Sequence, residues 1–358
     1  MDIRDDRARW VGIDVGADHS TTCIINQDGQ VIGQQEVRNS AACIADFIDA
    51  VANGNVALIG VEASSLSPHL VRGLRALNFP VAIFDSRQAR KYLRIRQNKT
   101  DRNDARGLAE IALHGRNIVS EVRLKSLECQ KVRSQLAMRQ HLVRHRVATE
   151  GAIRAVLRLN GGSLKKCTSA RTLRRNTLEA LEGVRNTEGL DLSDTVMPVL
   201  IFCEQLRKHL VDVDKALAAV AHEQEVCRRF MEISGIGPIS SLSFYSAVEE
   251  PTRFKRNEDI GPFLGMVPRV EQSGATVRRF GISRMGNKMT RQHLVTAASI
   301  YMRSAPKDAA VRRWGEQLRE RLPAQKVRIA VARKLAIIML AMWKNQTQYR
   351  PEGNLESS

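Results

Sequence analysis

Residues 11–37, VGIDVGADHSTTCIINQDGQVIGQQEV, decide the fold of the amino-terminal part of the chain. In the first six of them the apolar side chains occupy every second position, which is the period of a β-strand. Residues 20–26 favour a second strand, and Asp28-Gly29 is a hairpin turn signal before a third strand over residues 30–37. The stretch therefore predicts three consecutive, meandering strands.

Helices and strands alternate after this meander. Helical spacing predicts helices over residues 41–52 and 66–77, and apolar runs predict buried strands over residues 56–61 and 80–84. Three meandering strands followed by a strand–helix–strand unit are the element order of the ribonuclease H-like α/β fold and also of the actin-like ATPase fold. The pattern alone leaves both classes open.

From about Asp101 onward the sequence predicts helices. Residues 126–159 have the spacing of a long amphipathic helix with a basic outer face, and residues 199–229 predict a second one. Because residues 160–163 break the first helix with two glycines, we expect a helical hairpin or coiled coil in the middle of the chain. Residues 291–343 are again helical in pattern, which predicts a mostly α-helical carboxyl-terminal domain.

A glycine-rich segment, ISGIGPIS at residues 233–240, precedes an apolar helix. It resembles half of a helix-hairpin-helix motif, in which glycines let backbone N–H groups at a helix start approach a phosphate. A glycine-rich turn between two helices is the alternative interpretation. The segment alone does not decide between phosphate binding and a turn.

The charge of the chain is strongly basic and unevenly distributed. Lys and Arg number 56 against 38 Asp and Glu, which gives a formal net charge of +18. Residues 1–110 hold 14 basic and 14 acidic residues, so the whole excess falls on residues 111–358. Such an excess favours a polyanionic partner, because each phosphate that is neutralised releases condensed counterions. A basic helical surface without any ligand would have the same composition.

Cysteine usage and hydropathy predict the compartment. The six cysteines form no CxxC pair and no metal-binding spacing, which is typical of reduced cytosolic thiols. The charged start of the sequence, MDIRDDRARW, has no apolar signal region. The most apolar stretch, residues 329–343, is interrupted by Arg333 and Lys334 and is too short to span a bilayer. We expect a soluble cytoplasmic protein without a membrane partner.

Four carboxylates are candidates for chemistry: Asp14 within a strand, Glu62 at the end of another, and Asp101 and Asp104 one helical turn apart after Thr100, a predicted N-cap. A carboxylate in or at the end of a buried strand is costly unless it is neutralised. Hard oxygen ligands suit Mg²⁺ or Mn²⁺, and two such ions can bind the attacking and leaving oxygens of a phosphate. Asp101 would also fit as an acid that complements the helix dipole, and Glu62 as a member of a structural ion pair.

Six motifs together resemble one known family. GIDVG at residues 12–16, GVEASS at 60–65 and KTDRNDA at 99–105 resemble the acidic motifs of the DEDD transposases of bacterial insertion sequences. SGIGPISS at 234–241, FLGMVPRVEQSG at 263–274 and FGISRMGNKMTRQHL at 280–294 resemble the transposase domain of the same family. The motifs span most of the chain.

The resemblance implies an architecture and a set of site residues. It implies a RuvC-like DEDD nuclease domain over residues 8–160, a helical or coiled-coil region over 161–228, a transposase domain over 229–348 that contains the helix-hairpin-helix-like motif, and a disordered tail over 349–358. The implied metal-binding and catalytic carboxylates are Asp14, Glu62, Asp101 and Asp104, and the catalytic serine is Ser273. The family often has a second glycine after its Ser-Gly motif, whereas Ala275 follows Gly274 here.

The implied function is that of a DNA recombinase guided by a structured bridge RNA. Its expected partners are donor and target DNA, the guide RNA and further copies of the chain in a homodimer or homotetramer, and its expected cofactor is Mg²⁺ or Mn²⁺. Ser273 has no neighbouring His or carboxylate arranged as a triad, so its role comes from the resemblance. Alternatives are a hydrolytic junction resolvase in which metals activate water, an actin-like ATPase or sugar kinase, and a non-catalytic nucleic-acid binder.

Overall fold

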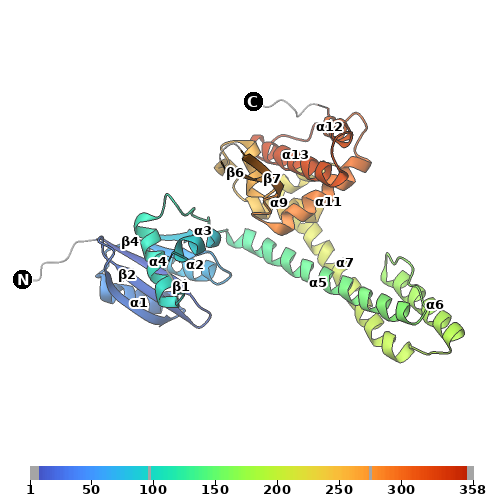
Figure 1. Cartoon of the computed structure of the whole chain (residues 1–358), viewed down its shortest axis with the longest axis horizontal. Helices are drawn as coiled ribbons and strands as arrows, with labels where there is room; N and C mark the ends of the chain where they lie inside the picture. Colours follow the sequence, from blue (N-terminus) through green and yellow to red (C-terminus); the bar gives the residue numbers. More distant parts are fainter. Residues whose placement is uncertain (1–7, 96–97, 274–275, 353–358) are drawn as a thin grey trace, which may run out of the picture. The chain divides into compact units, whose positions relative to one another are not determined.

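The computed structural model describes residues 8–95, 98–273 and 276–352, in two compact units (Figure 1). The amino-terminal unit ends at Ser126, and the helical unit begins at Leu127. The sequence predicts a first domain that ends only at residue 160, so the two divisions differ in where they place the long helix after Ser126. The functional domain boundaries expected from the sequence stay predictions.

The amino-terminal unit is a five-stranded sheet with helices on both faces. Its elements in chain order are β1 (Arg9–Val15), β2 (His19–Ile25), β3 (Val31–Arg38), α1 (Ala41–Ala52), β4 (Val56–Glu62), α2 (Ser67–Ala76), β5 (Val81–Phe84), α3 (Ser86–Leu93) and α4 (Asp101–His114). The strand order is β3-β2-β1-β4-β5. The meander β1–β3 is antiparallel, whereas β4 runs parallel to β1, and β5 runs parallel to β4.

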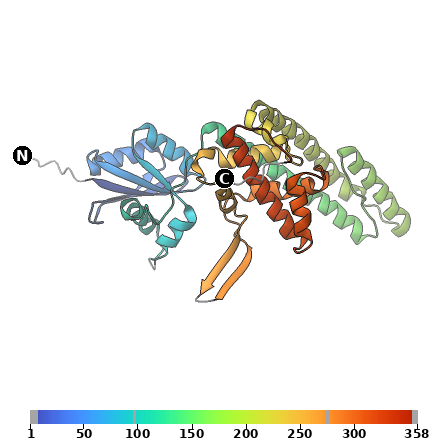
Figure 2. The ribbon, with the colours of Figure 1, turned by 90° about the horizontal axis from the view of Figure 1, so that it is seen from above.

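Alternation along the strands divides the core into two layers. Odd positions of β1 such as Val11 and Ile13 are fully buried with the apolar faces of α1 and α2. The opposite face packs against α4, where Leu108 and Ile111 are buried beside Phe84 of β5. Figure 2 shows the sheet between these helices. The expected mixed α/β sheet at the amino terminus is confirmed.

The helical unit contains the long helices that the sequence predicts. Its elements are α5 (Leu127–Leu159), α6 (Ala170–Glu188), α7 (Ser193–Glu223), α8 (Glu225–Met231), α9 (Pro238–Val248), η1 (Pro251–Arg253), η2 (Asn257–Asp259), α10 (Ile260–Phe263), β6 (Pro268–Ser273), β7 (Thr276–Ile282), α11 (Lys288–Ser304), α12 (Ala310–Arg319) and α13 (Ala324–Asn345). Val132 and Leu136 of α5 pack against Leu217 and Ala221 of α7, so these two helices lie side by side. A second core joins α9, α11 and α13. None of the helices in the described residues has the length and hydropathy to cross a bilayer.

Three local expectations need correction. The chain is not helical throughout after Asp101, because β6 and β7 form a hairpin. Helix α3 lies in a stretch where no helix was expected. The disordered tail expected over residues 349–358 includes a packed residue at its start. The Tyr349 hydroxyl hydrogen-bonds Tyr301 at 2.7 Å, and the Tyr349 ring packs on the main helical core. The last part of the expected tail, residues 353–358, lies outside the described residues.

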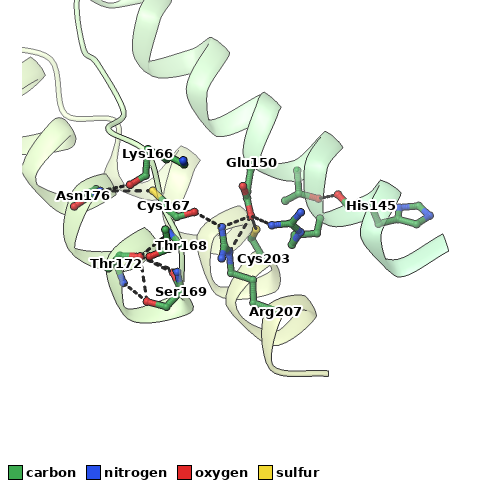
Figure 3. A network of polar contacts seen from close by, with 12 residues as sticks. His145, Glu150, Lys166, Cys167, Thr168, Ser169, Thr172, Asn176, Cys203 and Arg207 are labelled. Atoms are coloured by element: carbon green, nitrogen blue, oxygen red, sulfur yellow. Dashed lines mark hydrogen bonds and ion pairs between the residues drawn. The ribbon is translucent and has the colours of Figure 1, made fainter. Parts of the chain in front are cut away.

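A buried ion pair joins α5 to α7 (Figure 3). The Arg207 guanidinium donates to Glu150 Oε1 at 2.8 Å and to the Cys167 carbonyl at 3.0 Å. The side chains of Arg207 and Glu150 are only 8% and 13% exposed, and Arg146 lies 3.5 Å from the same carboxylate. The contact to Cys167 also ties the connection between α5 and α6 to the helix pair.

We expect Glu150→Ala to lower the free energy of unfolding of the helical unit by about 3–5 kcal/mol, because it leaves the buried Arg207 charge without its carboxylate. Urea denaturation followed by circular dichroism measures this change. The matched control is Glu179→Ala, which removes an exposed partner of Lys165 and should change stability by less than about 1 kcal/mol. Equal losses in the two variants would contradict the structural role of the Glu150 pair.

Candidate functional site

Adjacent parallel strands bring Asp14 and Glu62 to the same edge of the sheet. Ile13 of β1 pairs with Val61 of β4, and the two acids are the next residues along their strands. Both are partly buried and alternate with residues that face α1 and α2, so both lie on the face covered by α4. The sequence prediction that Glu62 ends a strand is confirmed.

The start of α4 supplies the other two carboxylates. The Thr100 hydroxyl accepts a hydrogen bond from the Asn103 backbone N–H at 3.2 Å, so Thr100 is the N-cap that the sequence predicts. Asp101 and Asp104 lie in the first turn, where the positive end of the helix dipole favours acidic side chains. The cap fixes where the helix begins and therefore where the two acids stand.

Two glycines let α4 lie directly on the sheet. Gly12 of β1 pairs with Gly60 of β4. A Cβ atom at Gly12 would overlap the Ala105 carbonyl oxygen of α4, and one at Gly60 would lie 2.8 Å from the Leu108 carbonyl oxygen. Ala109, one turn after Ala105, is fully buried in the same contact layer. This close approach holds the first turn of α4 beside the strand ends.

We expect Gly12→Ala to displace α4, to destabilise the amino-terminal unit by about 1–3 kcal/mol or more, and to impair the carboxylate site with it. Thermal unfolding and divalent-metal affinity measure the two effects. Gly151→Ala is the control, because a Cβ at this position of α5 meets nothing within 4 Å and should leave stability unchanged or slightly raised. A Gly12→Ala protein with the stability of the unaltered chain would contradict the packing argument.

The four carboxylates interact electrostatically. Burial, followed by the charges of Asp104, Asp101 and Glu62 in that order, raises the pKa of Asp14 to about 6, although Lys99 acts to lower it. Burial also raises the pKa of Glu62, and Arg90, whose Nη2 lies 3.8 Å from Glu62 Oε1, opposes this rise. The structure thus brings the four predicted site residues into one negative field.

The donor set fits a hard divalent cation by its chemistry. All four groups are carboxylates, and two of them are partly desolvated, so a bound cation would relieve both burial and repulsion. Among the residues that the structure describes, no three His, Cys, Asp or Glu side chains form a preformed metal-binding group. The fit therefore rests on the charge and donor type of the four carboxylates, whose side chains would move closer together when an ion binds.

Ser273 belongs to the other unit. It is the last residue of β6, is exposed, and pairs with Thr276 at the start of β7. His293 lies on α11, where burial lowers its pKa to about 4 and keeps the ring neutral near pH 7.

The glycine-rich segment before α9 forms a tight turn between α8 and α9. Gly235 has a φ of +85°, which favours glycine, and a Cβ there would lie 2.6 Å from the Ala297 carbonyl oxygen of α11. This packing accounts for the glycine as part of a helix-to-helix turn. Phosphate binding by the segment stays a prediction.

The residues that hold the site together are not apparent from the sequence alone. Lys99 and Arg90 are the nearby cations, and Gly12, Gly60 and Ala105 set the distance between helix and sheet. The sequence does contain the residues that allow the close approach. Two neighbouring strands each have a glycine, and α4 has small residues on the side that faces these glycines. The close approach becomes visible only when the register of β1 and β4 is known.

Comparisons with known proteins cover most of the chain. Residues 11–160 match the DEDD transposase family of IS110 elements, and residues 227–312 match the transposase family described as IS116/IS110/IS902. The transposase for insertion sequence element IS1111A of Coxiella burnetii is 30% identical over 345 residues, which is 95% of this chain and 91% of the relative. A probable family 20 transposase of Pseudomonas aeruginosa is 30% identical over 82% of this chain and 86% of its own length.

Proposed function

The chain belongs to the IS110/IS116 family of insertion-sequence transposases, and from this premise we propose that it exchanges DNA strands through a covalent serine intermediate with metal assistance. The observation that carries the proposal is the convergence of Asp14, Glu62, Asp101 and Asp104 beside one edge of the sheet. Such a carboxylate set suits phosphoryl transfer, in which charge develops on oxygen atoms around phosphorus.

Two transesterifications describe the proposed reaction. The Ser273 hydroxyl gives up its proton and its oxygen attacks a DNA phosphorus to form a serine–phosphate bond, while the bond from phosphorus to the 3′-oxygen of the cut strand breaks and that oxygen takes up a proton. The 3′-hydroxyl of a new strand then attacks the same phosphorus, gives up its proton and releases Ser273. Each step exchanges one phosphoester bond for another, so no external energy source is required.

The four carboxylates would hold Mg²⁺ or Mn²⁺, which lowers the pKa of a coordinated oxygen nucleophile and stabilises charge on phosphate oxygens when it is bound. Asp14 and Glu62 would bind from the strand ends, and Asp101 and Asp104 from the first turn of α4. Lys99 and Arg90 limit the repulsion among these acids. We assign the unit a ribonuclease H-like, RuvC-like fold, which the meander and the strand order β3-β2-β1-β4-β5 support.

Donor DNA, target DNA and a structured guide RNA are the proposed partners. The charge of the chain supports this, because the whole excess of +18 falls after residue 110. Guidance by RNA would assign target choice to base pairing, so the side chains need not encode it. Assembly as a homodimer or homotetramer completes the proposal.

The test is the detection of a protein–DNA adduct. The protein is incubated with Mg²⁺, transcripts from the DNA that flanks its coding region and labelled duplexes of the element ends, and is then denatured in SDS. We expect labelled DNA to migrate with the protein and to be released by protease. Cleavage with free 5′-phosphates and without any adduct would instead favour a hydrolytic resolvase, in which water is the nucleophile.

A further inference from the structure

The hairpin of β6 and β7, called the ribbon below, is a separate two-stranded sheet. In the described part of the chain its strands pair only with each other, and every residue of β6 is exposed. Figure 2 shows the ribbon projecting from the helices of its own unit. A two-stranded sheet with no covering element is marginally stable alone in water, so a projecting one suits a surface that gains a partner.

The base of the ribbon is firmly anchored. The buried Arg291 side chain of α11 donates hydrogen bonds to the carbonyls of Leu264 and Met285, which lie just before and just after the two strands. Gly265 and Gly286 both have positive φ, and a Cβ atom at Gly265 would overlap the Met285 carbonyl. The ribbon therefore leaves the helical body from a closely packed base, in a direction that the base sets.

The face of the ribbon that carries Ser273 is basic. Residues that pair across antiparallel strands share a face, so the pair of Glu271 and Arg278 and the Ser273 position lie on one side. Arg269 is on the same side of β6, and its guanidinium stacks on Phe280 at 4.5 Å. Glu271, 3.3 Å from Arg269, is the single acidic residue of the two strands.

The opposite face is mixed: it carries two exposed valines, and the pairing register places Gln272 and the Arg279 position on the same side. Val270 and Val277 are 53% and 51% exposed, and Gln272 pairs with Val277. A β-ribbon fits the major groove of DNA, which is about 12 Å wide and presents phosphates at its rims and thymine methyl groups on its floor. A six-residue strand spans about 20 Å, enough to cross such a groove.

We propose that the ribbon docks in a groove of duplex DNA, with Arg269 and Arg278 contacting phosphates, and positions Ser273 for attack. The proposal rests on the proposed role of Ser273 as nucleophile. Duplex DNA is favoured over a second protein chain as the partner because the serine-bearing face has two arginines and a single acidic residue, Glu271, which lies 3.3 Å from Arg269. The arginines are positioning residues, and Ser273 is the group that reacts.

The test measures affinity of the full chain for a 30-base-pair fluorescent duplex as salt is varied. We expect Arg278→Ala to weaken binding roughly three- to tenfold near 0.1 M salt and to reduce the slope of log K against log salt by about 1, and the Arg269→Ala/Arg278→Ala pair to reduce it by about 2. Arg185→Ala, an exposed arginine of α6, a helix that packs in a different hydrophobic core from the base of the ribbon, is the control and should change both values less.

Four outcomes separate this proposal from the proposed function. Unchanged affinity and slope in both ribbon variants would overturn groove docking, even if the serine adduct forms normally. Loss of binding in the ribbon variants together with full binding by Ser273→Ala would support it, because only the positioning residues then contribute to affinity. If Val277→Asp and the unaltered chain differ in molecular mass in sedimentation without DNA, the ribbon contacts another protein chain, and groove docking would be overturned. An adduct that persists in Ser273→Ala would refute the serine mechanism, whatever the ribbon binds.

Discussion

Ser273→Ala is expected to bind DNA like the unaltered protein and to form no covalent adduct and no recombinant product. The substitution removes one hydroxyl from an exposed strand end, so the carboxylates, the arginines of the ribbon and the packed base stay in place. Loss of a covalent nucleophile removes the whole pathway, which we expect to appear as a decrease of at least about 10³-fold in product. The adduct assay in SDS and sequencing of the joined strands measure the two losses.

Ser283→Ala is the matched control, since this serine follows β7, its hydroxyl accepts a long 3.5 Å hydrogen bond from the Met285 N–H, and its backbone bond to Val267 is kept in alanine. It should keep both adduct and product. Ser273→Cys should keep a trace of adduct at most, because a thiolate is nucleophilic but differs in geometry and in metal preference. A hydrolytic resolvase predicts the opposite for Ser273→Ala, namely cleavage at the rate of the unaltered protein.

Much of the amino-terminal unit follows from local sequence. Alternation in VGIDVG and the Asp28-Gly29 turn predict the meander, and the strand ends predict where Asp14 and Glu62 lie. The distance between α4 and the sheet does not follow, because it depends on the pairing of Gly12 with Gly60, which is set by strand register. The grouping of the acids is therefore a tertiary property, although each acid is recognisable locally.

The ribbon could not be predicted from hydrophobic periodicity. A strand with one buried face alternates apolar and polar residues, but β6 is exposed on both faces and reads as a polar, glycine-bounded loop. The role proposed for Ser273 came from resemblance alone, since its neighbours contain no general base. Helix α3 was missed for a related reason: its eight residues bury only Ala89 and give little periodic signal.

Asp14→Asn is expected to abolish strand exchange while making the metal-free protein more stable near pH 7. Loss of a metal-binding carboxylate should lower activity by more than about 100-fold. This exceeds the loss of about 10- to 100-fold that is typical when a residue that only hydrogen-bonds to a metal ligand is replaced. The same change removes a partly buried charge that Asp104, Asp101 and Glu62 repel. Activity in Mg²⁺ and the melting temperature with and without Mn²⁺ measure the two opposed effects, and Asp18→Asn, an exposed acid of the same unit, should alter neither.

The pH dependence of stability distinguishes a metal site from a structural ion pair. In the metal-free chain the pKa of Asp14 is raised from 3.8 to about 6, so the folded state binds its proton more tightly than the unfolded state. The resulting stabilisation is fully present below about pH 4 and is lost as the pH rises through 6. Asp14→Asn should therefore flatten the stability profile between pH 4 and 6.

In the unaltered protein Mn²⁺ should raise the melting temperature at pH 7.5 and much less at pH 5, because protons compete for the carboxylate. If Asp14 were instead part of a structural ion pair, the stability of the unaltered protein would fall on acidification, and Asp14→Asn would be less stable than the unaltered protein. Either result would remove Asp14 from the metal site.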